Sequence, residues 1–171
     1  MKDYLLDTNI IGFIVDYKNG STKKDSVAVG KKLSLIKKTN AKLLLCPVSV
    51  GESEYGIRLN IKGTLHKSVI LKSIIDSFGF MDINKNIARE SYSELRKRLY
   101  IKYAPKKKKS SWPEEWVDPI SSKEIQIQEN DLWLAAIAMT YNMILVTNDK
   151  MTAIKDVAGT DVKFENWVEG N

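Results

Sequence analysis

Four acidic residues stand where the sequence suggests that a strand ends or a helix begins. They are Asp7 after "YLL", Glu52 in "PVSVGESEYG", Asp131 in "QENDLWLAAIAM" and Asp149 in "ILVTNDKM". Carboxylates gathered in one place repel each other, which raises their pKa values and costs stability unless a cation lies among them. Oxygen ligands of this kind suit Mg²⁺ or Mn²⁺, which keep several waters and leave positions for phosphate oxygens.

Each acid, taken singly, also has a structural explanation. Asp7 suits the N-cap of the helix that follows it. Ser49 and Glu52 have the S-x-x-E spacing of a capping box. Asp131 would favour the positive end of its helix, and Asp149 would close a turn or cap the next helix. Caps and turns are the common use of such residues, so no single acid decides between a cap and a functional site.

Short apolar runs alternate with helical patterns along the chain. The expected strands are Tyr4 to Leu6, Lys42 to Cys46, Phe78 to Met81, Met143 to Thr147, and Val162 to Phe164. Expected helices include Ile10 to Tyr17, Val27 to Lys38, and a stripe of Ala88, Tyr92, Leu95 and Leu99. Strands separated by helices need crossovers, and crossovers make parallel pairs. The pattern therefore predicts an α/β fold, a three-layer α/β/α sandwich with a central parallel sheet of four to five strands.

A parallel sheet would bring the four acids to one place. All of its strands point the same way, so acids that follow strands or begin neighbouring helices collect at one edge, where open α/β sheets bind ligands. Rival ligand sets are scarce. The single histidine, His66, has no histidine or cysteine companion nearby in the sequence, and Cys46 is expected to be buried and inert. The glycine-rich loops that cradle nucleotide phosphates are missing from the sequence.

The bulk composition narrows the class of protein. The 171 residues are about the size of one domain, and a single cysteine excludes an internal disulfide framework. With no signal-like start and no long apolar span, the expectation is a cytoplasmic protein without a membrane partner. The formal net charge of +6 favours an acidic or phosphate-bearing partner, although excess lysine also keeps proteins soluble.

One long polar stretch looks like an insert in the single domain expected over residues 1–171. It lies around residues 104–122 and reads "YAPKKKKSSWPEEWVDPISSKE", with three of the four prolines. Its lysines, Lys106, Lys107, Lys108 and Lys109, form either a solvated loop or an arm that contacts phosphates. Trp112 and Trp116 would either pin the insert to the domain or stack on RNA bases.

The chain resembles the PIN-domain family, and within it the VapC-type ribonuclease toxins of toxin–antitoxin systems. The matching segments are "YLLDTNII", "VSVGESEYG", "NDLWLAAIAM", and "LVTNDKM" with "VKFENW", which cover the chain from end to end in the family's order. "DTN" alone would be a weak signal, whereas four ordered motifs are specific. The lysine and tryptophan insert and a longer link near Asn19 depart from a minimal member of the family.

The resemblance implies roles for particular residues. Asp7, Glu52, Asp131 and Asp149 become the acidic cluster that holds Mg²⁺ or Mn²⁺ and catalyses cleavage. Thr8, Asn9, Thr147 and Asn148 become polar neighbours that orient carboxylates or waters. Glu54 is the rival for the second acid, but the pair Tyr55–Gly56, three residues after Glu52, fixes the register in favour of Glu52.

The function implied is that of a metal-dependent endoribonuclease, the toxin of a type II toxin–antitoxin pair. Its partners would be RNA, a cognate antitoxin and a second copy of the chain. Arg96, Arg98 and the four lysines of the insert would contact RNA phosphates. A helix with a face of Ile70, Leu71, Ile74 and Ile75 would supply either a dimer surface or part of the core.

Two other functions remain open at this point. The first is a PIN-like adapter that binds RNA or protein and has lost its chemistry, although such a protein has little reason to keep four mutually repelling acids. The second is an α/β enzyme of the phosphatase or phosphotransfer kind with Asp7 as nucleophile. That kind of enzyme would have a second aspartate at position 9, where this chain has Asn9.

Overall fold

The computed structural model describes residues 2–59, 64–105, 112–117 and 124–168. The elements are β1 (Tyr4–Leu6), α1 (Thr8–Lys18), α2 (Lys24–Ile36), β2 (Leu43–Leu45), α3 (Pro47–Leu59), α4 (Thr64–Ser77), β3 (Gly79–Phe80), the π-helical segment η1 (Ile87–Tyr92), α5 (Ser93–Tyr103), the 3₁₀ turn η2 (Pro113–Glu115), α6 (Glu129–Tyr141), β4 (Ile144–Val146), α7 (Thr152–Ala158) and β5 (Lys163–Glu165). Within the described ranges, every helix is too short or too polar to cross a lipid bilayer.

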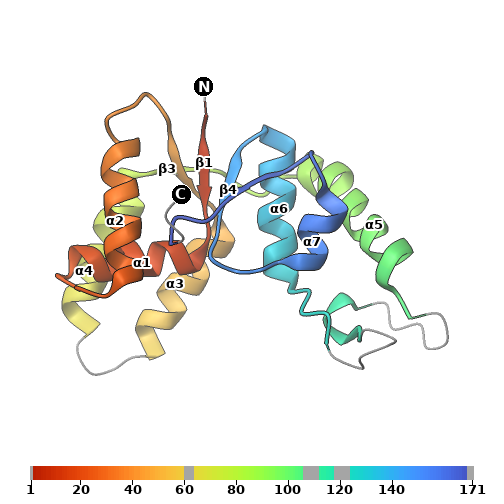
Figure 1. The fold of residues 1–171 in the computed structure, drawn as a ribbon, viewed down its shortest axis with the longest axis horizontal. Coiled ribbons are helices and arrows are strands. Elements are labelled where there is room, and N and C mark those ends of the chain that lie inside the picture. Colours follow the sequence, from red (N-terminus) through yellow and green to blue (C-terminus); the bar gives the residue numbers. More distant parts are fainter. Residues whose placement is uncertain (1, 60–63, 106–111, 118–123, 169–171) are drawn as a thin grey trace. The chain divides into compact units, whose positions relative to one another are not determined.

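A five-stranded sheet organises the fold, in the order β3-β2-β1-β4-β5 (Figure 1). Strand β1 pairs in parallel with both β2 and β4, so that Tyr4 lies opposite Leu43 and Ile144. Strand β2 pairs in parallel with β3. Every residue of β1, β2 and β4 is buried, as expected of parallel strands covered on both faces. The predicted α/β fold with a parallel sheet is confirmed.

The predicted elements are present, and most of their ends differ by one to three residues. Strand β1 has its predicted bounds, whereas β4 is a shorter piece of the predicted run and β5 begins and ends one residue later. Helix α1 begins at Thr8 rather than Ile10, because Asp7 is already its N-cap. Helix α2 covers Lys24–Ile36 instead of the expected Val27 to Lys38.

By its internal contacts the chain divides into two compact units. The first unit comprises Met1–Asp82, Met143–Asp149 and Phe164–Asn171, and it contains the sheet, except for Lys163 of β5, and helices α1 to α4. The second unit comprises Ile83–Asn142 and Lys150–Lys163, with α5, α6 and α7. A single domain over residues 1–171, with an insert at 104–122, stays a prediction.

The core of the first unit is built from the sheet and the inner faces of its helices. Helix α1 contributes Ile10 and Ile14, and α2 contributes Val29 and Leu33. On α4, the residues Leu71 and Ile74 are buried in the same core, with Ile70 and Ile75 packed against it. The apolar face of α4 is therefore part of the core, which was one of the two alternatives predicted for it; the other was a dimer surface.

The second unit is built around the apolar helix α6, which packs against η1, α5 and α7. The predicted stripe is found there, with Leu95 and Leu99 of α5 fully buried. Tyr92 stacks on Trp133 of α6, with ring centroids 4.0 Å apart. Such a stacked aromatic pair adds to the burial that holds the two helical segments together.

Candidate functional site

Asp7 lies at the carboxyl end of β1 and is almost completely buried, with 3% of its surface exposed. Its Oδ1 accepts a hydrogen bond of 2.6 Å from the backbone N–H of Thr8, which makes Asp7 the N-cap of α1. Its Oδ2 accepts from Thr147 Oγ1 at 2.6 Å and from Asn9 Nδ2 at 2.9 Å. Asp7 is therefore both a helix cap and the centre of a polar cluster.

The surroundings of Asp7 disfavour its ionised form. The pKa of Asp7 is raised to about 6, chiefly by burial. Hydrogen bonds from Thr147 and Thr8 lower this pKa, and the negative charges of Asp149 and Glu52 raise it. At neutral pH the side chain is mostly ionised, and its charge is incompletely solvated. A cation beside it would offset this cost.

Glu52 reaches the same cluster from α3, where its Oε2 accepts a hydrogen bond from Thr8 Oγ1. The capping-box interpretation of Glu52 is wrong. Helix α3 begins at Pro47, so Ser49 lies inside the first turn, and its hydroxyl donates to the Cys46 carbonyl at 3.2 Å. The rival acid, Glu54, instead forms an ion pair with Arg58 Nε at 3.8 Å.

The segment after β4 completes the cluster in the first unit. Thr147 is 1% exposed, and its Oγ1 accepts from the backbone N–H of Asp149 at 2.9 Å while donating to Asp7. The backbone N–H of Asn148 donates to Asn9 Oδ1 at 3.1 Å. The four polar neighbours named from the sequence thus lie in contact with the acids or with one another.

Sequence reasoning missed Asn166, which extends this network. Its Nδ2 donates to Asn148 Oδ1 at 3.1 Å, and its Oδ1 accepts from the backbone N–H of Val168 at 2.9 Å. The available signal was its position directly after the final strand, in the "VKFENW" motif. Polar residues that follow a parallel strand gather at the same sheet edge as Asp7.

Asp131 belongs to the second unit. It is the third residue of α6 and half-buried, and Gln128 is the N-cap of that helix. Placement in the first helical turn suits an acid, whatever its further role. The first unit therefore gathers Asp7, Glu52 and Asp149, and the joining of Asp131 to them stays a prediction.

Among the residues that the structure describes, the acidic cluster has oxygen donors but lacks the spacing of a complete metal-binding set. In the described part of the chain, no group of three histidine, cysteine, aspartate or glutamate side chains has the spacing of a metal-binding set. The donors in the first unit are nevertheless all oxygens, and Asp7 carries a buried charge that two neighbouring acids disfavour. Such a donor set fits a hard divalent cation of the Mg²⁺ type.

Cys46 and His66 are the side chains that would suit a softer metal, and neither belongs to the acidic cluster. Cys46 is buried, and burial raises the pKa of its thiol, so it stays protonated and unreactive. His66 is exposed on α4. Both findings agree with the roles expected from the sequence.

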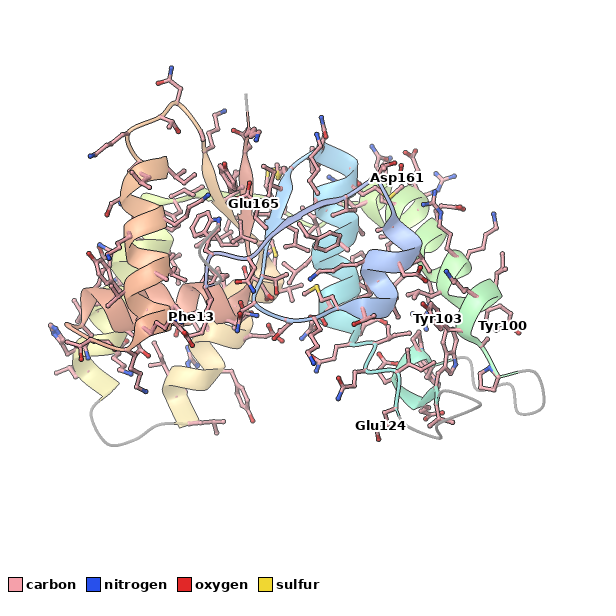
Figure 2. The ribbon with its side chains drawn as sticks, viewed as in Figure 1. Phe13, Tyr100, Tyr103, Glu124, Asp161 and Glu165 are labelled. Carbon is pink, nitrogen blue, oxygen red and sulfur yellow. The ribbon has the colours of Figure 1, made fainter. Side chains whose placement is uncertain are left out.

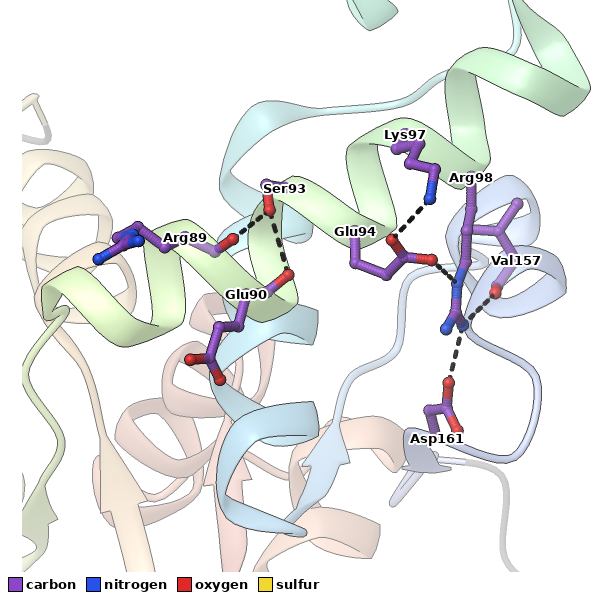
Figure 3. A network of polar contacts seen from close by, with 8 residues as sticks. All are labelled: Arg89, Glu90, Ser93, Glu94, Lys97, Arg98, Val157 and Asp161. Atoms are coloured by element: carbon purple, nitrogen blue, oxygen red, sulfur yellow. Dashed lines mark hydrogen bonds and ion pairs between the residues drawn. The ribbon is translucent and has the colours of Figure 1, made fainter.

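The two arginines predicted to contact RNA are engaged within the second unit. Arg98 donates to Asp161 at 2.7 Å, to Glu94 at 3.0 Å and to the Val157 carbonyl at 3.2 Å (Figure 3). Arg96 forms an ion pair with Glu129 at 3.3 Å. Phosphates would have to compete with these carboxylates for either guanidinium group.

The insert has a packed portion and an exposed portion. Trp116 is 1% exposed and meets Tyr100 edge to face, with ring centroids 6.0 Å apart. Trp116 thus pins the insert and does not serve as a stacking surface. Trp112 is 58% exposed and lies under the guanidinium of Arg96, 5.5 Å from the ring centroid. Lys106, Lys107, Lys108 and Lys109 lie outside the described residues.

A groove of about 630 Å³ adjoins the acidic cluster in the first unit. Helices α1, α3 and α4 form its walls, and Thr8, Asn9 and Glu52 line the end shared with the cluster. Its other lining is largely apolar, including Phe13 of α1, which is labelled in Figure 2, and Ile57 of α3. The groove could receive an amphipathic segment that ends near the acids.

Comparisons with known proteins agree with this geometry. A family model described as the PIN domain matches residues 4–159. No curated protein matches the chain. Among solved structures, the chain is similar to VapBC2 from Rickettsia felis bound to a DNA fragment from their promoter, with a TM-score of 0.67 and 22% identity over 96% of this chain and 98% of that one.

Two further structures share the fold. VapBC-1 from nontypeable Haemophilus influenzae has a TM-score of 0.65 and 20% identity, covering 98% of this chain and 99% of that one. VapBC-5 from Mycobacterium tuberculosis, a member of the VapBC family of toxin–antitoxin systems, has a TM-score of 0.59 and 17% identity, covering 97% and 99%. At these identities the likeness is one of fold.

Proposed function

Because the chain belongs to the PIN-domain family, we propose that it is a divalent-cation-dependent endoribonuclease, the toxin of a type II toxin–antitoxin pair acting in the cytoplasm. The observation that carries the proposal is the buried carboxylate of Asp7, held by three donors and flanked by Glu52 and Asp149. A helix cap does not need three acids close together. The repulsion among them costs stability unless a bound cation offsets their charge. The similar VapBC structures support the toxin assignment.

Some of the acids would bind the cation, and one would position the attacking water. Asp7, Asp131 and Asp149 would hold Mg²⁺ or Mn²⁺ directly or through water, and Glu52 would position the attacking water. When bound, such a cation offsets charge on phosphate oxygens and lowers the pKa of water. An all-oxygen donor set is suited to this chemistry.

Two threonines fix the geometry of the acids. Thr8 connects two of them, because its N–H donates to Asp7 and its hydroxyl donates to Glu52. Thr147 connects another pair, because its hydroxyl donates to Asp7 and accepts from the N–H of Asp149. The carboxylates of Asp7 and Glu52 are therefore oriented, and the backbone at Asp149 is anchored, before any ligand arrives. Polar neighbours tune metal sites in this way.

RNA binding is the second part of the proposal. Arg96 and Arg98 would contact phosphates only by giving up carboxylate partners, so the proposal depends little on them. We propose that the run Lys106 to Lys109 contacts RNA phosphates. Replacing these four lysines by glutamine should then weaken RNA binding and its salt dependence, and unchanged affinity would remove this run from the proposal.

We propose that the antitoxin occupies the groove between α1, α3 and α4. An amphipathic segment would place its apolar side on Phe13 and Ile57 and a basic side chain near Glu52, which closes access to the acids. Replacing Ile57 by Glu should abolish inhibition by the antitoxin while RNA cleavage persists. Inhibition at the wild-type concentration would contradict this placement.

A homodimer is also part of the proposal. The predicted face of α4 is used by the core, but large apolar side chains stay exposed where α3 ends and α4 begins: Tyr55 at 64%, Leu59 at 63%, Leu65 at 84% and Val69 at 61%. An exposed apolar patch of this kind is typical of an interaction surface. Light scattering of the purified chain should give the mass of a dimer, and a monomer mass would contradict it.

The cleavage assay tests the function itself. Total cellular RNA is incubated with the wild type, with Asp7→Asn and with the exposed control Asp76→Asn, in Mg²⁺, Mn²⁺ or EDTA. We expect cleavage by the wild type and by Asp76→Asn with either cation, and a loss of about 100-fold or more in Asp7→Asn and in EDTA. Full activity in EDTA would contradict the cation, and RNA binding without cleavage under every condition would favour the inactive adapter.

A further inference from the structure

Helix α2 and its ends form a strongly basic segment of the chain. Residues 23–38 contain six lysines and one aspartate, a net charge of +5, against +6 for all 171 residues. Within the helix, Lys24, Lys31 and Lys32 are spaced so that they share one face. Helix α2 therefore gives the first unit a local excess of positive charge.

These three lysines line a cavity of about 710 Å³, which we call the lysine basin. Its α2 wall also contains Val27, Ala28 and Leu35, and the opposite wall is Phe164 to Trp167 from β5 and the residues after it. Among the lining residues the single acid is Glu165, labelled in Figure 2. Its partner is Lys32, at 3.7 Å in a partly exposed ion pair that contributes little and exchanges readily.

The lysine basin is continuous with the acidic cluster through a chain of hydrogen bonds. Asn166 lines the basin and donates to Asn148. The backbone of Asn148 donates to Asn9, which in turn donates to Asp7. All of these residues belong to the first unit, so the basin begins where the polar network around Asp7 ends.

The two kinds of lining match the two parts of a nucleotide. The lysines at the rim suit phosphates, and the apolar wall with Leu35 and the partly buried Phe164 suits the face of a base. A duplex keeps its bases paired and stacked inside, so it would use only the lysines. An unpaired strand can use both, by laying a base on the apolar wall.

We propose that the lysine basin binds the unpaired RNA strand that flanks the phosphate to be cut. The inference rests on the proposed nuclease function and assigns its substrate path to Lys24, Lys31 and Lys32, rather than to the arginines of the second unit. The strand would run from the acidic cluster past Asn166 and along the exposed face of α2. Figure 1 shows α2 antiparallel to β1, so this path leads away from the carboxyl edge of the sheet.

A binding measurement without cleavage tests the basin. A labelled, unstructured RNA of about 12 nucleotides is titrated in EDTA with the wild type, with Lys24→Gln/Lys31→Gln, and with the control Lys72→Gln/Lys85→Gln. All four lysines are exposed, and both double variants remove two charges. For single strands each phosphate contact contributes about 0.7 to the slope of log K against log salt, so the basin variant should lose about 1.4 of slope and about 25-fold in affinity near 0.1 M salt.

The control should bind like the wild type, and duplex RNA should bind the basin more weakly than the single strand. Equal losses in the two double variants would overturn the proposal, because they would report only the overall charge. Polyglutamate that binds as tightly as RNA, with the same dependence on Lys24 and Lys31, would also overturn it in favour of an acidic protein partner. Because EDTA prevents the proposed cleavage, failure of the nuclease function would leave this result unchanged.

Discussion

At the scale of single residues, the donors around Asp7 separate a cap from a functional site. A capping aspartate needs only backbone N–H donors from the first turn of its helix. Asp7 accepts one such bond from Thr8 and two more from the side chains of Asn9 and Thr147. Thr147 directly follows another strand of the sheet, β4, so the sequence around Asp7 alone could predict the cap but not this cluster.

The raised pKa of Asp7 predicts a pH-dependent stability in the metal-free protein. The folded value of about 6 lies above the ordinary value of 3.8, so the folded state binds the proton more tightly than the unfolded state. This contribution to stability is complete below about pH 4 and is lost as the pH rises through about 6. The shift corresponds to at most about 3 kcal/mol.

Urea unfolding in EDTA measures this effect. We expect Asp7→Asn to gain stability relative to the wild type between about pH 4 and pH 7, by up to about 3 kcal/mol, because asparagine carries no charge. Groups that do not interact with Asp7 titrate equally in both proteins, so the difference between them reports Asp7 and its interactions with Asp149 and Glu52. A difference that does not change with pH would contradict the assigned pKa.

The hydroxyl of Thr147 predicts a linked loss of stability and activity. Thr147→Val leaves Asp7 and the N–H of Asp149 without this partner, so we expect a cost of about 1–3 kcal/mol and cleavage slowed by about 10–100-fold. Thr140→Val is the matched control, because its hydroxyl bonds Ser91 at 2.7 Å in the second unit. It should lose stability but keep the cleavage rate per folded molecule. A fully active Thr147→Val protein would show that this hydroxyl only supports the fold.

At the scale of elements, the strands were predictable, whereas the starts of α2 and α3 were not. Short apolar runs such as "YLL" and "ILV" are bounded by polar residues, and parallel pairing buries them completely. Helix α2 begins after Lys23, which makes no side-chain capping bond, so the usual N-cap signal is missing there and only Asp25 in the first turn marks the start. The spacing of Ser49 and Glu52 imitated a capping box, whereas Pro47 at the first helical position was the true signal.

The packing of α2 on α1 predicts opposite effects for two glycines. A Cβ on Gly30 of α2 would lie 2.4 Å from ring atoms of Tyr17, so Gly30→Ala should cost about 1–3 kcal/mol. Gly12 of α1 has no atom within 4 Å of such a Cβ. Gly12→Ala should therefore be neutral or stabilising by up to about 1 kcal/mol. Thermal unfolding compares the two, and adding Tyr17→Ala should reduce the Gly30→Ala penalty. Equal effects of the two alanines would contradict this packing.

At the scale of the whole molecule, the charge count suggested a phosphate-bearing partner but not where it binds. Arg98 has one acid four residues before it and another, Asp161, far along the chain, and only the fold brings all three together. The lysines of α2 have a single acid, Asp25, in their own segment, and the distant Glu165 pairs with Lys32, so the segment keeps an excess of positive charge. Pairing between distant residues decides which cations are available, and a single sequence does not reveal it.

The joining of Asp131 to Asp7, Glu52 and Asp149 is the central claim, and Mn²⁺ binding tests it most directly. Metal-free protein is titrated with Mn²⁺ and followed by electron paramagnetic resonance, using the wild type, Asp131→Asn and the control Glu129→Gln. Glu129 shares the first turn of α6 but pairs with Arg96. We predict that Asp131→Asn binds Mn²⁺ at least about tenfold more weakly and that Glu129→Gln binds it like the wild type. Wild-type affinity in Asp131→Asn would contradict a site shared by the four acids.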